Sequence, residues 1–382
     1  MIRVLHYSTH DEDCGIAKYQ EQFHEDLSLH DIESVFFEVS PNKVKVKNRE
    51  ERRAVFDELA RQLADFDILH IQHEFGFFVE DDFTVLVNKA KQLGKKVVVS
   101  VHTSPSVVMK RERLMGLGPR SFVVYGKHRL RLARFIKRHI NGFKASDILF
   151  VHNFPTRDSL QSFSVPGAKI KRIMHPVPKK RQQGRSSFIR QNLKAGPEDI
   201  VFCIVGFLHK NKGVFDAIRA LRFLPENYKL AIIGGLHPFS DETKIYNKIA
   251  NTVDKLNLRD RVYITGFIQD DALLDSYIQE CDACVYPYDR DYYASVSSGS
   301  LNLAFANGRP AIAYPTQSFK EMNEFKEAII LTQTFAYYEL AKELLKIKPG
   351  QKLTVEAEEY IKLHSWPEQT KKIAEEYRTL FT

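Results

Sequence analysis

Residues 199–221 read DIVFCIVGFLHKNKGVFDAIRAL, a stretch in which one turn separates two different patterns. A short run of apolar and β-branched residues ends at Gly206, and the apolar residues that follow recur with the period of a helix. A buried strand followed by an amphipathic helix is part of a βαβ unit, which forms a parallel sheet. The same alternation recurs along the whole chain, so we expect an α/β protein.

The expected strands form two groups. The first contains IRVLHYS, SVFFEV, DILHIQ, KKVVVSVH, DILFVH and KIKRIMH, and the second contains DIVFCIVG, YKLAIIGG, DRVYITG, DACVYPY, PAIAY and AIILT. Between the groups, residues 176–200 are polar, basic and rich in proline and glycine, and their apolar residues show no sustained period, as in a linker. A length of 382 residues also exceeds what one hydrophobic core normally supports. We therefore expect two doubly wound, Rossmann-like domains, over residues 1–178 and 179–364, followed by a terminal helix over residues 365–382.

Composition narrows the class of protein. The N-terminal MIRVLHYS lacks the pattern of a signal peptide, and no apolar segment reaches the roughly 18–20 residues that span a bilayer, so we expect a cytoplasmic location. Cys281 and Cys284 form a CxxC pair without a second pair of zinc ligands. We interpret them as small buried residues.

The formal charge of +8 is concentrated in one block. From Lys110 to Arg138 ten residues are Lys or Arg, and only Glu112 is acidic. Such a block indicates an anionic partner, which could be a phospholipid surface, a lipid phosphate or nucleic acid. Within it, Leu130, Ala133 and Ile136 or Ile140 fall on one helical stripe, so the helix could lie on a membrane or pack on the sheet with its cations in solvent.

Two turns in the second half suit phosphate groups. Gly206 allows a tight turn after a strand, and Lys212 precedes a helix. In SVSSGSLNLAFANGRPAIAYP, residues 295–315, a Ser/Gly turn precedes another helix, whose first N–H groups can bind an anion. The alternatives are a surface lysine and an ordinary serine N-cap. The P-loop pattern is absent, which disfavours nucleoside triphosphate hydrolysis.

Polar residues also follow strands in the first half. The strand expected in DILHIQHEFGFF, residues 67–78, ends at His73, Glu74 and Gly76, and the strand expected in KKVVVSVHTSP, residues 95–105, ends at His102. Gly15 opens a helix after the first strand. A lone histidine is usually structural, but several polar strand ends at one edge of a sheet favour a ligand site.

The order of these motifs resembles the family 4 retaining glycosyltransferases over essentially the full length of the chain. The matching segments are QHEFG, VSVHT, ASDILFVHN, IMHPVP, GF followed by KG, TGFIQDDALLDSYIQECDACVYPY, SSGSL, GRP and the HSW terminal segment. The resemblance implies the GT-B fold, with two Rossmann-like domains, an interdomain cleft and a C-terminal helix that crosses back to the first domain. It also implies an enzyme of polysaccharide biosynthesis. The basic block leaves open that this cytoplasmic protein is peripheral on the inner face of a membrane.

The resemblance assigns roles to individual residues. His102 would contact the sugar near the reacting carbon, and Lys212 would neutralise the donor diphosphate. Besides Lys212, the set expected on the donor is Gly15, Gly206, Phe207, His209, Gly266, Phe267, Ile268, Ser297, Ser298, Gly299, Ser300 and Asn302. The set expected on the acceptor side is Cys14, His73, Glu74, Thr103, Lys110 and Arg111.

The chain departs from the family pattern in two places. Phe207 stands where many members have an arginine, and Ser295 and Leu303 stand where the E-x7-E pattern has glutamates. A subgroup with SG at this place matches better, and Asn302 could replace a lost sugar or ribose contact. The missing glutamates leave open a catalytically silent GT-B binding module.

We expect no metal and no cofactor, with a UDP- or GDP-sugar as the donor substrate and a glycan, lipid-linked or other acceptor. Two DxD-like strings, at residues 11–13 and 289–291, could suggest a divalent metal. Lys212 and helix N-termini already supply positive charge in this fold, which argues against one. The basic block keeps nucleic-acid binding as an alternative from another class, although no RNA-binding or helix-turn-helix pattern accompanies it. The sequence does not indicate an oligomeric state.

Overall fold

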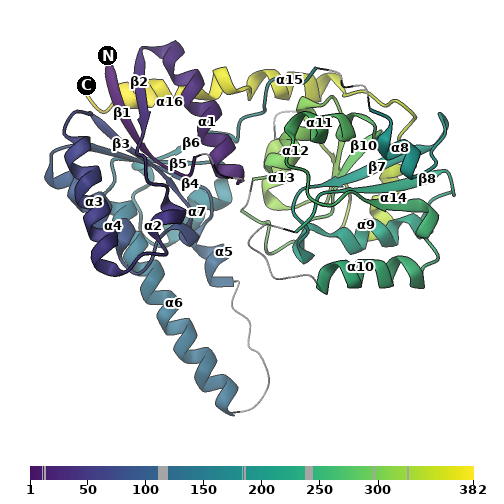
Figure 1. The fold of residues 1–382 in the computed structure, drawn as a ribbon, viewed down its shortest axis with the longest axis horizontal. Helices are drawn as coiled ribbons and strands as arrows, with labels where there is room; N and C mark the ends of the chain where they lie inside the picture. The colour runs from purple at the N-terminus through teal and green to yellow at the C-terminus, as the bar shows by residue number, and fades with distance from the viewer. Residues whose placement is uncertain are drawn as a thin grey trace. The chain divides into compact units, whose positions relative to one another are not determined.

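The computed structural model describes residues 1–382 except 11, 13, 111–118, 183, 185, 237–243, 296 and 325–326, and except the side chains of 110 and 119–124. The chain divides into two compact units. Unit 1 contains Met1–His175, Ser295–Ser297 and Trp366–Thr382, and unit 2 contains Pro176–Ala294 and Ser298–Ser365. Each unit is built on one six-stranded sheet with helices on both faces (Figure 1).

The sheet of unit 1 is parallel throughout, with the strand order β2-β1-β3-β4-β5-β6. Its strands are β1 (Ile2–Tyr7), β2 (Ile32–Phe36), β3 (Ile68–His73), β4 (Lys96–Val101), β5 (Ile148–Val151) and β6 (Ile170–Arg172). The direction of winding reverses between β1 and β3. Open α/β sheets bind ligands beside the carboxyl ends of the strands at such a reversal.

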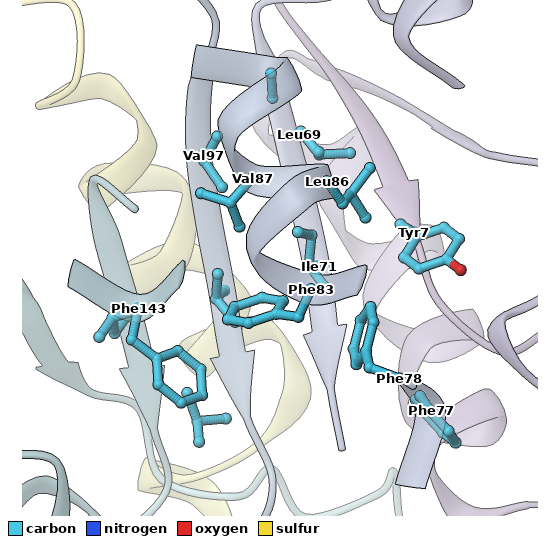
Figure 2. Packing of buried hydrophobic residues seen from close by; sticks show 14 of the residues in the cluster. Tyr7, Leu69, Ile71, Phe77, Phe78, Phe83, Leu86, Val87, Val97 and Phe143 are labelled. Carbon is cyan, nitrogen blue, oxygen red and sulfur yellow. The ribbon is translucent and has the colours of Figure 1, made fainter. Parts of the chain in front are cut away.

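Alternating side chains give this sheet two separate cores, because neighbouring residues of a strand face opposite sides. The side that includes Leu5 is covered by α3 (Arg49–Leu63), α4 (Asp82–Gln92) and part of α6 (Pro119–Ala145). Figure 2 shows Phe83, Leu86 and Val87 of α4 packed over strand residues of this side. The side that includes Val4 is covered by α1 (Gly15–Leu27) and α16 (Trp366–Arg378).

The last helix, α16, is anchored in the second of these cores. Trp366, Ile373 and Tyr377 are buried there. The Tyr377 hydroxyl lies 2.6 Å from Nδ1 of His70 on β3, and Nε2 of His70 lies 2.9 Å from the Ser100 hydroxyl. A segment more than three hundred residues away from β3 in the chain therefore completes the N-terminal unit.

The other elements of unit 1 are short. They are α2 (Pro41–Val44), α5 (Pro105–Lys110), α7 (Phe154–Ser162) and the 3-10 turns η1 (Ser28–His30), η2 (Phe75–Phe77) and η3 (Gly167–Lys169).

The sheet of unit 2 is also parallel, with the order β12-β11-β10-β7-β8-β9. Its strands are β7 (Ile200–Val205), β8 (Tyr228–Ile233), β9 (Val262–Ile264), β10 (Ala283–Tyr286), β11 (Ala311–Ala313) and β12 (Ile330–Leu331). This is the Rossmann order, in which the winding reverses between the first and fourth strands, here β7 and β10.

Helices cover both faces of this second sheet (Figure 1). One face packs on α9 (Val214–Ala220), α10 (Lys244–Lys255) and α14 (Tyr337–Leu344). The remaining elements are α8 (Phe188–Asn192), α11 (Asp271–Gln279), α12 (Gly299–Ala306), α13 (Gln317–Met322), α15 (Val355–Leu363), η4 (Lys210–Lys212), η5 (Leu221–Phe223) and η6 (Arg259–Arg261). The predicted α/β fold with two doubly wound sheets is confirmed.

The expected linker is more ordered than its sequence pattern indicates. Helix α8 lies inside residues 176–200, with Ile189 fully buried. The guanidinium of Arg190 lies 2.8 Å from Oδ2 of Asp282 and also donates to the carbonyl of Glu280. These partners lie about ninety residues away along the chain, so no local period could reveal the helix.

The interpretation of the cysteine pair is confirmed. Cys281 and Cys284 are free and fully buried, and Sγ of Cys284 lies 3.4 Å from Sγ of Cys203 on β7. Burial raises the pKa of the Cys281 thiol. Among the helices in the described parts of the chain, none is long and apolar enough to cross a membrane.

We expect unit 1 to lose stability in acid. Burial lowers the pKa of His70, His139 and His152 from 6.5 to about 3. Between these pH values the unfolded chain binds protons that the folded chain does not. The contribution of these histidines to the free energy of unfolding is therefore complete above pH 6.5. Below this pH, each histidine lowers the free energy of unfolding by up to about 1.4 kcal/mol per pH unit. Thermal unfolding followed by circular dichroism should show a falling melting temperature between about pH 7.5 and 5.5, and a constant value in this range would contradict the prediction.

Candidate functional site

The candidate site in unit 2 begins where β7 ends. Gly206 follows β7 with a φ of +114°, and its N–H donates to the carbonyl of Ile233 on β8. A Cβ atom at position 206 would lie 2.9 Å from Nζ of Lys212. The glycine therefore lets the lysine side chain fold back over the carboxyl end of the strand.

A second glycine brings the segment after β7 against the segment after β10. Gly213 separates η4 from α9 and has a φ of +73°. A Cβ atom at this position would lie only 1.9 Å from the carbonyl oxygen of Pro287, which follows β10. The N–H of Asp289 also donates to the carbonyl of Asn211, at 2.9 Å. Lys212 is thus held beside the point where the winding of the sheet reverses.

Lys212, Tyr288, Ser298 and Ser300 form one connected group, which we call the Lys212–hydroxyl cluster. Nζ of Lys212 lies 3.2 Å from the Tyr288 hydroxyl. The same hydroxyl lies 3.1 Å from Oγ of Ser298 and 3.0 Å from Oγ of Ser300. The two turns that the sequence predicts as phosphate-binding are therefore brought together through Tyr288, which sequence reasoning missed. Its only signal was a polar aromatic residue at the end of the predicted strand segment DACVYPY.

The cluster is suited to an anion with several oxygen atoms. Ser298 caps α12 by accepting a hydrogen bond from the N–H of Leu301, and the first turn of α12 contains no acidic residue. The first N–H groups of a helix lack acceptors within that helix and carry partial positive charge. An ammonium group beside such N–H groups matches a phosphate or diphosphate.

An aromatic pair follows two of the strand ends of the same sheet. The rings of Phe207, after β7, and Phe267, after β9, stack at 5.8 Å with an interplanar angle of 9°. Phe267 is 43% exposed. Gly266 has a φ of +78° with open space around its Cα, and Ile268 is partly buried. His209 caps η4, and its ring lies 5.5 Å from that of Tyr292.

Two residues expected on the donor make contacts outside the Lys212–hydroxyl cluster. Ser297 belongs to unit 1, where its hydroxyl accepts a hydrogen bond from the Asn153 amide at 3.2 Å. Asn302 is only 2% exposed, and its amide donates to the carbonyl of Pro176 at 3.1 Å. This contact holds the start of unit 2.

In unit 1, three histidines follow the carboxyl ends of neighbouring strands. His102, His152 and His175 come after β4, β5 and β6, and each ring lies between 5.3 and 5.5 Å from the ring of Tyr19 on α1. Nε2 of His102 lies 2.7 Å from Oε1 of Gln72. Burial, and secondarily the neighbouring histidines, hold the pKa of His102 well below its usual range. At neutral pH it is an uncharged hydrogen-bonding group.

Of the other residues expected on the acceptor side, some are described by the structure and others are not. Cys14 caps α1, with its sulfur accepting from the N–H of Ala17 at 3.4 Å, and Gly15 follows it with open space around its Cα. The Thr103 hydroxyl donates to the Glu74 carboxylate. Lys110 ends α5, and its side chain lies outside the described part of the structure, as does all of Arg111.

His73 differs from the expectation. It is fully buried, with Nε2 lying 2.9 Å from Nδ1 of His139 on α6 and its ring stacked on Phe78. The strand pleat turns this side chain into the core beneath α4 and α6, which removes it from any surface that an acceptor can reach.

The DxD-like string at residues 289–291 forms no metal centre in the part of the chain that the structure describes. Oδ1 of Asp289 accepts from the N–H groups of Asp291 and Tyr292, at 3.0 and 2.8 Å, so this carboxylate closes a turn. Asp11 and Asp13 lie outside the described residues. Across the described ranges, no group of three or more His, Cys, Asp or Glu side chains could hold a metal ion.

Solved structures show that this architecture is the GT-B fold. The HepE protein of Anabaena in complex with UDP has a TM-score of 0.65 at 14% identity, covering 98% of this chain and 95% of that one. Sucrose-phosphate synthase of Thermosynechococcus elongatus has a TM-score of 0.71 at 18% identity, covering 100% and 99%. WaaG, a glycosyltransferase involved in lipopolysaccharide biosynthesis, has a TM-score of 0.58 at 15% identity, covering 98% and 95%.

Sequence comparison adds the class of enzyme for the C-terminal unit. Residues 186–364 match the family described as Glycosyl transferases group 1, and nearly all of this range belongs to unit 2. No curated protein matches the chain significantly. The family match and the fold together support a glycosyltransferase.

We expect Gly213→Ala to destabilise unit 2 more than Gly308→Ala. Both glycines have a φ near +70°, so alanine carries a similar backbone cost of about 1–2 kcal/mol at each. Only at Gly213 would the new methyl group meet a backbone oxygen, because nothing lies within 4 Å of a Cβ atom at Gly308. The clash should add about 1–3 kcal/mol, measurable by urea unfolding. Equal losses in the two variants would show that the Pro287 contact can relax without cost.

Proposed function

We propose that this chain is a retaining glycosyltransferase that moves a sugar from a UDP- or GDP-sugar to an acceptor without a metal ion. The observation that carries the proposal is the Lys212–hydroxyl cluster, which joins the two turns predicted to bind phosphate at the reversal point of the sheet. The group 1 family match over the same unit supports it.

In the proposed mechanism, the diphosphate of the donor lies against Lys212 and the first turn of α12. Cleavage of the sugar–phosphate bond places negative charge on the departing diphosphate. A preorganised ammonium group and helix N–H groups stabilise that charge as it develops, which is usually the largest contribution to such catalysis. Because the protein supplies this positive charge, a divalent cation is unnecessary. The departing oxygen takes the acceptor proton on the same face, so the configuration at the sugar is retained.

Other residues would bind the remaining parts of the substrates. The exposed face of the stacked Phe207 and Phe267 pair suits a nucleobase, since aromatic rings stack on flat heterocycles. Uncharged His102 suits a hydrogen bond to a sugar hydroxyl. HepE has been crystallised with UDP and with UDP-glucose, which supports testing uridine nucleotides first.

We expect Lys212→Ala to reduce glycosyl transfer at least about a hundredfold, because the loss of one charge at the leaving group costs on the order of 3 kcal/mol. The measurement is turnover with UDP- and GDP-sugars at saturating donor, after melting temperatures with UDP, GDP, ADP and CMP have identified the nucleotide. Lys255→Ala, at an exposed position of α10, is the matched control and should retain full activity.

Near-normal turnover of the Lys212 variant would contradict the assignment of the phosphate site. Nucleotide binding by the wild-type protein without turnover, over a broad set of acceptors, would favour the silent binding module. Inversion of the product's anomeric configuration in NMR spectra would contradict the retaining mechanism.

Helix α6 supports a further element of the proposal, a lipid-linked acceptor at an anionic membrane surface. In the structure, one part of the predicted apolar stripe of α6 is buried and the other part is exposed. Ile136 and Ile140 are buried in the core of unit 1, whereas Leu130 is 53% exposed and Ala133 is also exposed. The N-terminal part of α6 therefore projects from the body of unit 1 (Figure 1).

The projecting part of α6 is basic. The sequence of α6 contains no acidic residue, and Lys127, Arg131, Arg134 and Lys137 are exposed. A cationic surface with an exposed leucine is complementary to anionic lipid headgroups. An acceptor held in the same membrane would then be concentrated near unit 1.

We expect replacement of Lys127, Arg131, Arg134 and Lys137 by glutamine to release the protein from anionic liposomes, since each cation near the surface contributes about 1 kcal/mol. Sedimentation at low salt should show binding of the wild type to anionic but not to neutral vesicles. A quadruple variant with the same change of charge in unit 2, at Lys244, Lys248, Lys255 and Lys362, is the control. Equal sedimentation of the wild type and the α6 variant would point to a soluble acceptor, and salt-sensitive binding to RNA or DNA instead would favour the nucleic-acid alternative.

A further inference from the structure

The three hydroxyl groups of the Lys212–hydroxyl cluster form a closed triangle. The Tyr288 hydroxyl lies 3.1 Å from Ser298 and 3.0 Å from Ser300, and the two serine hydroxyls lie 3.1 Å from each other. Each hydroxyl has one proton to donate and two lone pairs that accept. In a triangle of this kind each hydroxyl can donate to one neighbour and accept from the other, so all three protons are used inside the ring.

The partners outside the triangle fit the remaining lone pairs. Lys212 can only donate, so it supplies a proton to the second lone pair of Tyr288, at 3.2 Å. Ser298 likewise accepts a second hydrogen bond, from the N–H of Leu301 at 3.3 Å. Tyr288 is thereby fully paired, and one of the three N–H donors of Lys212 is committed to it.

The aromatic ring of Tyr288 is held firmly in the core. The side chain is 1% exposed, with the rings of Tyr293 and Phe319 at 4.1 and 5.6 Å. A hydroxyl on a buried, packed ring is a fixed point, whereas a lysine side chain has a flexible four-carbon stem. The hydrogen bond from Lys212 to Tyr288 therefore restricts the position of the ammonium group.

We propose that Tyr288 is the positioning residue of the phosphate site: its hydroxyl orients Lys212 toward the first turn of α12 and leaves two ammonium protons for the diphosphate. Because each hydroxyl proton is donated within the triangle, the diphosphate is bound by Lys212 and the backbone N–H groups of α12. The serine hydroxyls fix the position of the Tyr288 hydroxyl. Tyr288 itself does not touch the ligand. This role of Tyr288 rests on the proposed nucleotide-sugar site, in which Tyr288 fixes the orientation of Lys212.

The test is a double-mutant cycle of Tyr288→Phe and Lys212→Ala, with affinities for UDP and for uridine measured by calorimetry, or for GDP and guanosine if the melting-temperature panel selects guanine. Tyr288→Phe keeps the packed ring and removes only the hydroxyl. We expect it to weaken UDP binding about tenfold, the typical effect of one hydrogen bond, and to leave uridine binding unchanged because uridine has no phosphate. In the Lys212→Ala background the same change should have less than about a twofold effect, since Tyr288 acts through the lysine.

Tyr314→Phe is the matched control. Tyr314 is a buried tyrosine of the same unit whose hydroxyl donates to Oδ2 of Asp216 at 3.0 Å, away from the triangle. It should preserve the affinity for UDP. Independent, additive effects of Tyr288→Phe and Lys212→Ala, or equal weakening of UDP and uridine, would overturn the positioning role.

A second measurement tests the inference even if no nucleotide binds and the proposed function fails. The NMR signals of the Lys212 side chain, 13Cε and 15Nζ, report its surroundings directly. We expect Tyr288→Phe to shift them and to bring them toward the values of mobile lysines, whereas Tyr314→Phe should leave them in place. Unchanged Lys212 signals in the Tyr288 variant would overturn the proposal.

Discussion

The contact of Gly213 with the carbonyl oxygen of Pro287 sets the geometry on which the candidate site depends. The two segments that follow β7 and β10 can approach so closely only because no side chain stands between them, and the left-handed backbone at Gly213 turns α9 away immediately afterward. This approach places Lys212 within reach of Tyr288. Without it, the lysine and the serine turn before α12 would remain separate features at two strand ends.

The position of the site follows from the topology of the sheet. Chain connections leave β7 and β10 in opposite directions, so the space above their carboxyl ends is not crossed by a connection. The strands themselves are fully buried, and the residues of the candidate site lie just beyond them. Unit 1 repeats this arrangement with a different chemistry, because uncharged buried histidines stand where unit 2 has an ammonium group and hydroxyls.

Local patterns predicted the strands, the helices and the two glycine turns, because each depends on residues close together in the chain. Local patterns did not predict features that depend on contacts between residues far apart in the chain. In the expected linker, helix α8 buries Ile189, and the partners of Arg190 lie about ninety residues away along the chain. The strand pattern could place His73 at the end of β3 but could not show that α6 covers it. Asn302 lies on the predicted helix, but no local pattern could show that its amide donates to the carbonyl of Pro176.

The sequence by itself determined the fold class and the likeness to a glycosyltransferase family, and it predicted two turns as phosphate-binding. Periodicity, glycine and cap residues are local properties that can be read without coordinates. Only the tertiary structure decided which polar residues act together. A hydrogen bond between Lys212 and Tyr288 joins residues 76 positions apart, and the two serines that complete the triangle lie at the N-terminus of α12. Such convergence depends on how the strands are ordered in the sheet, which no local pattern in the chain specifies.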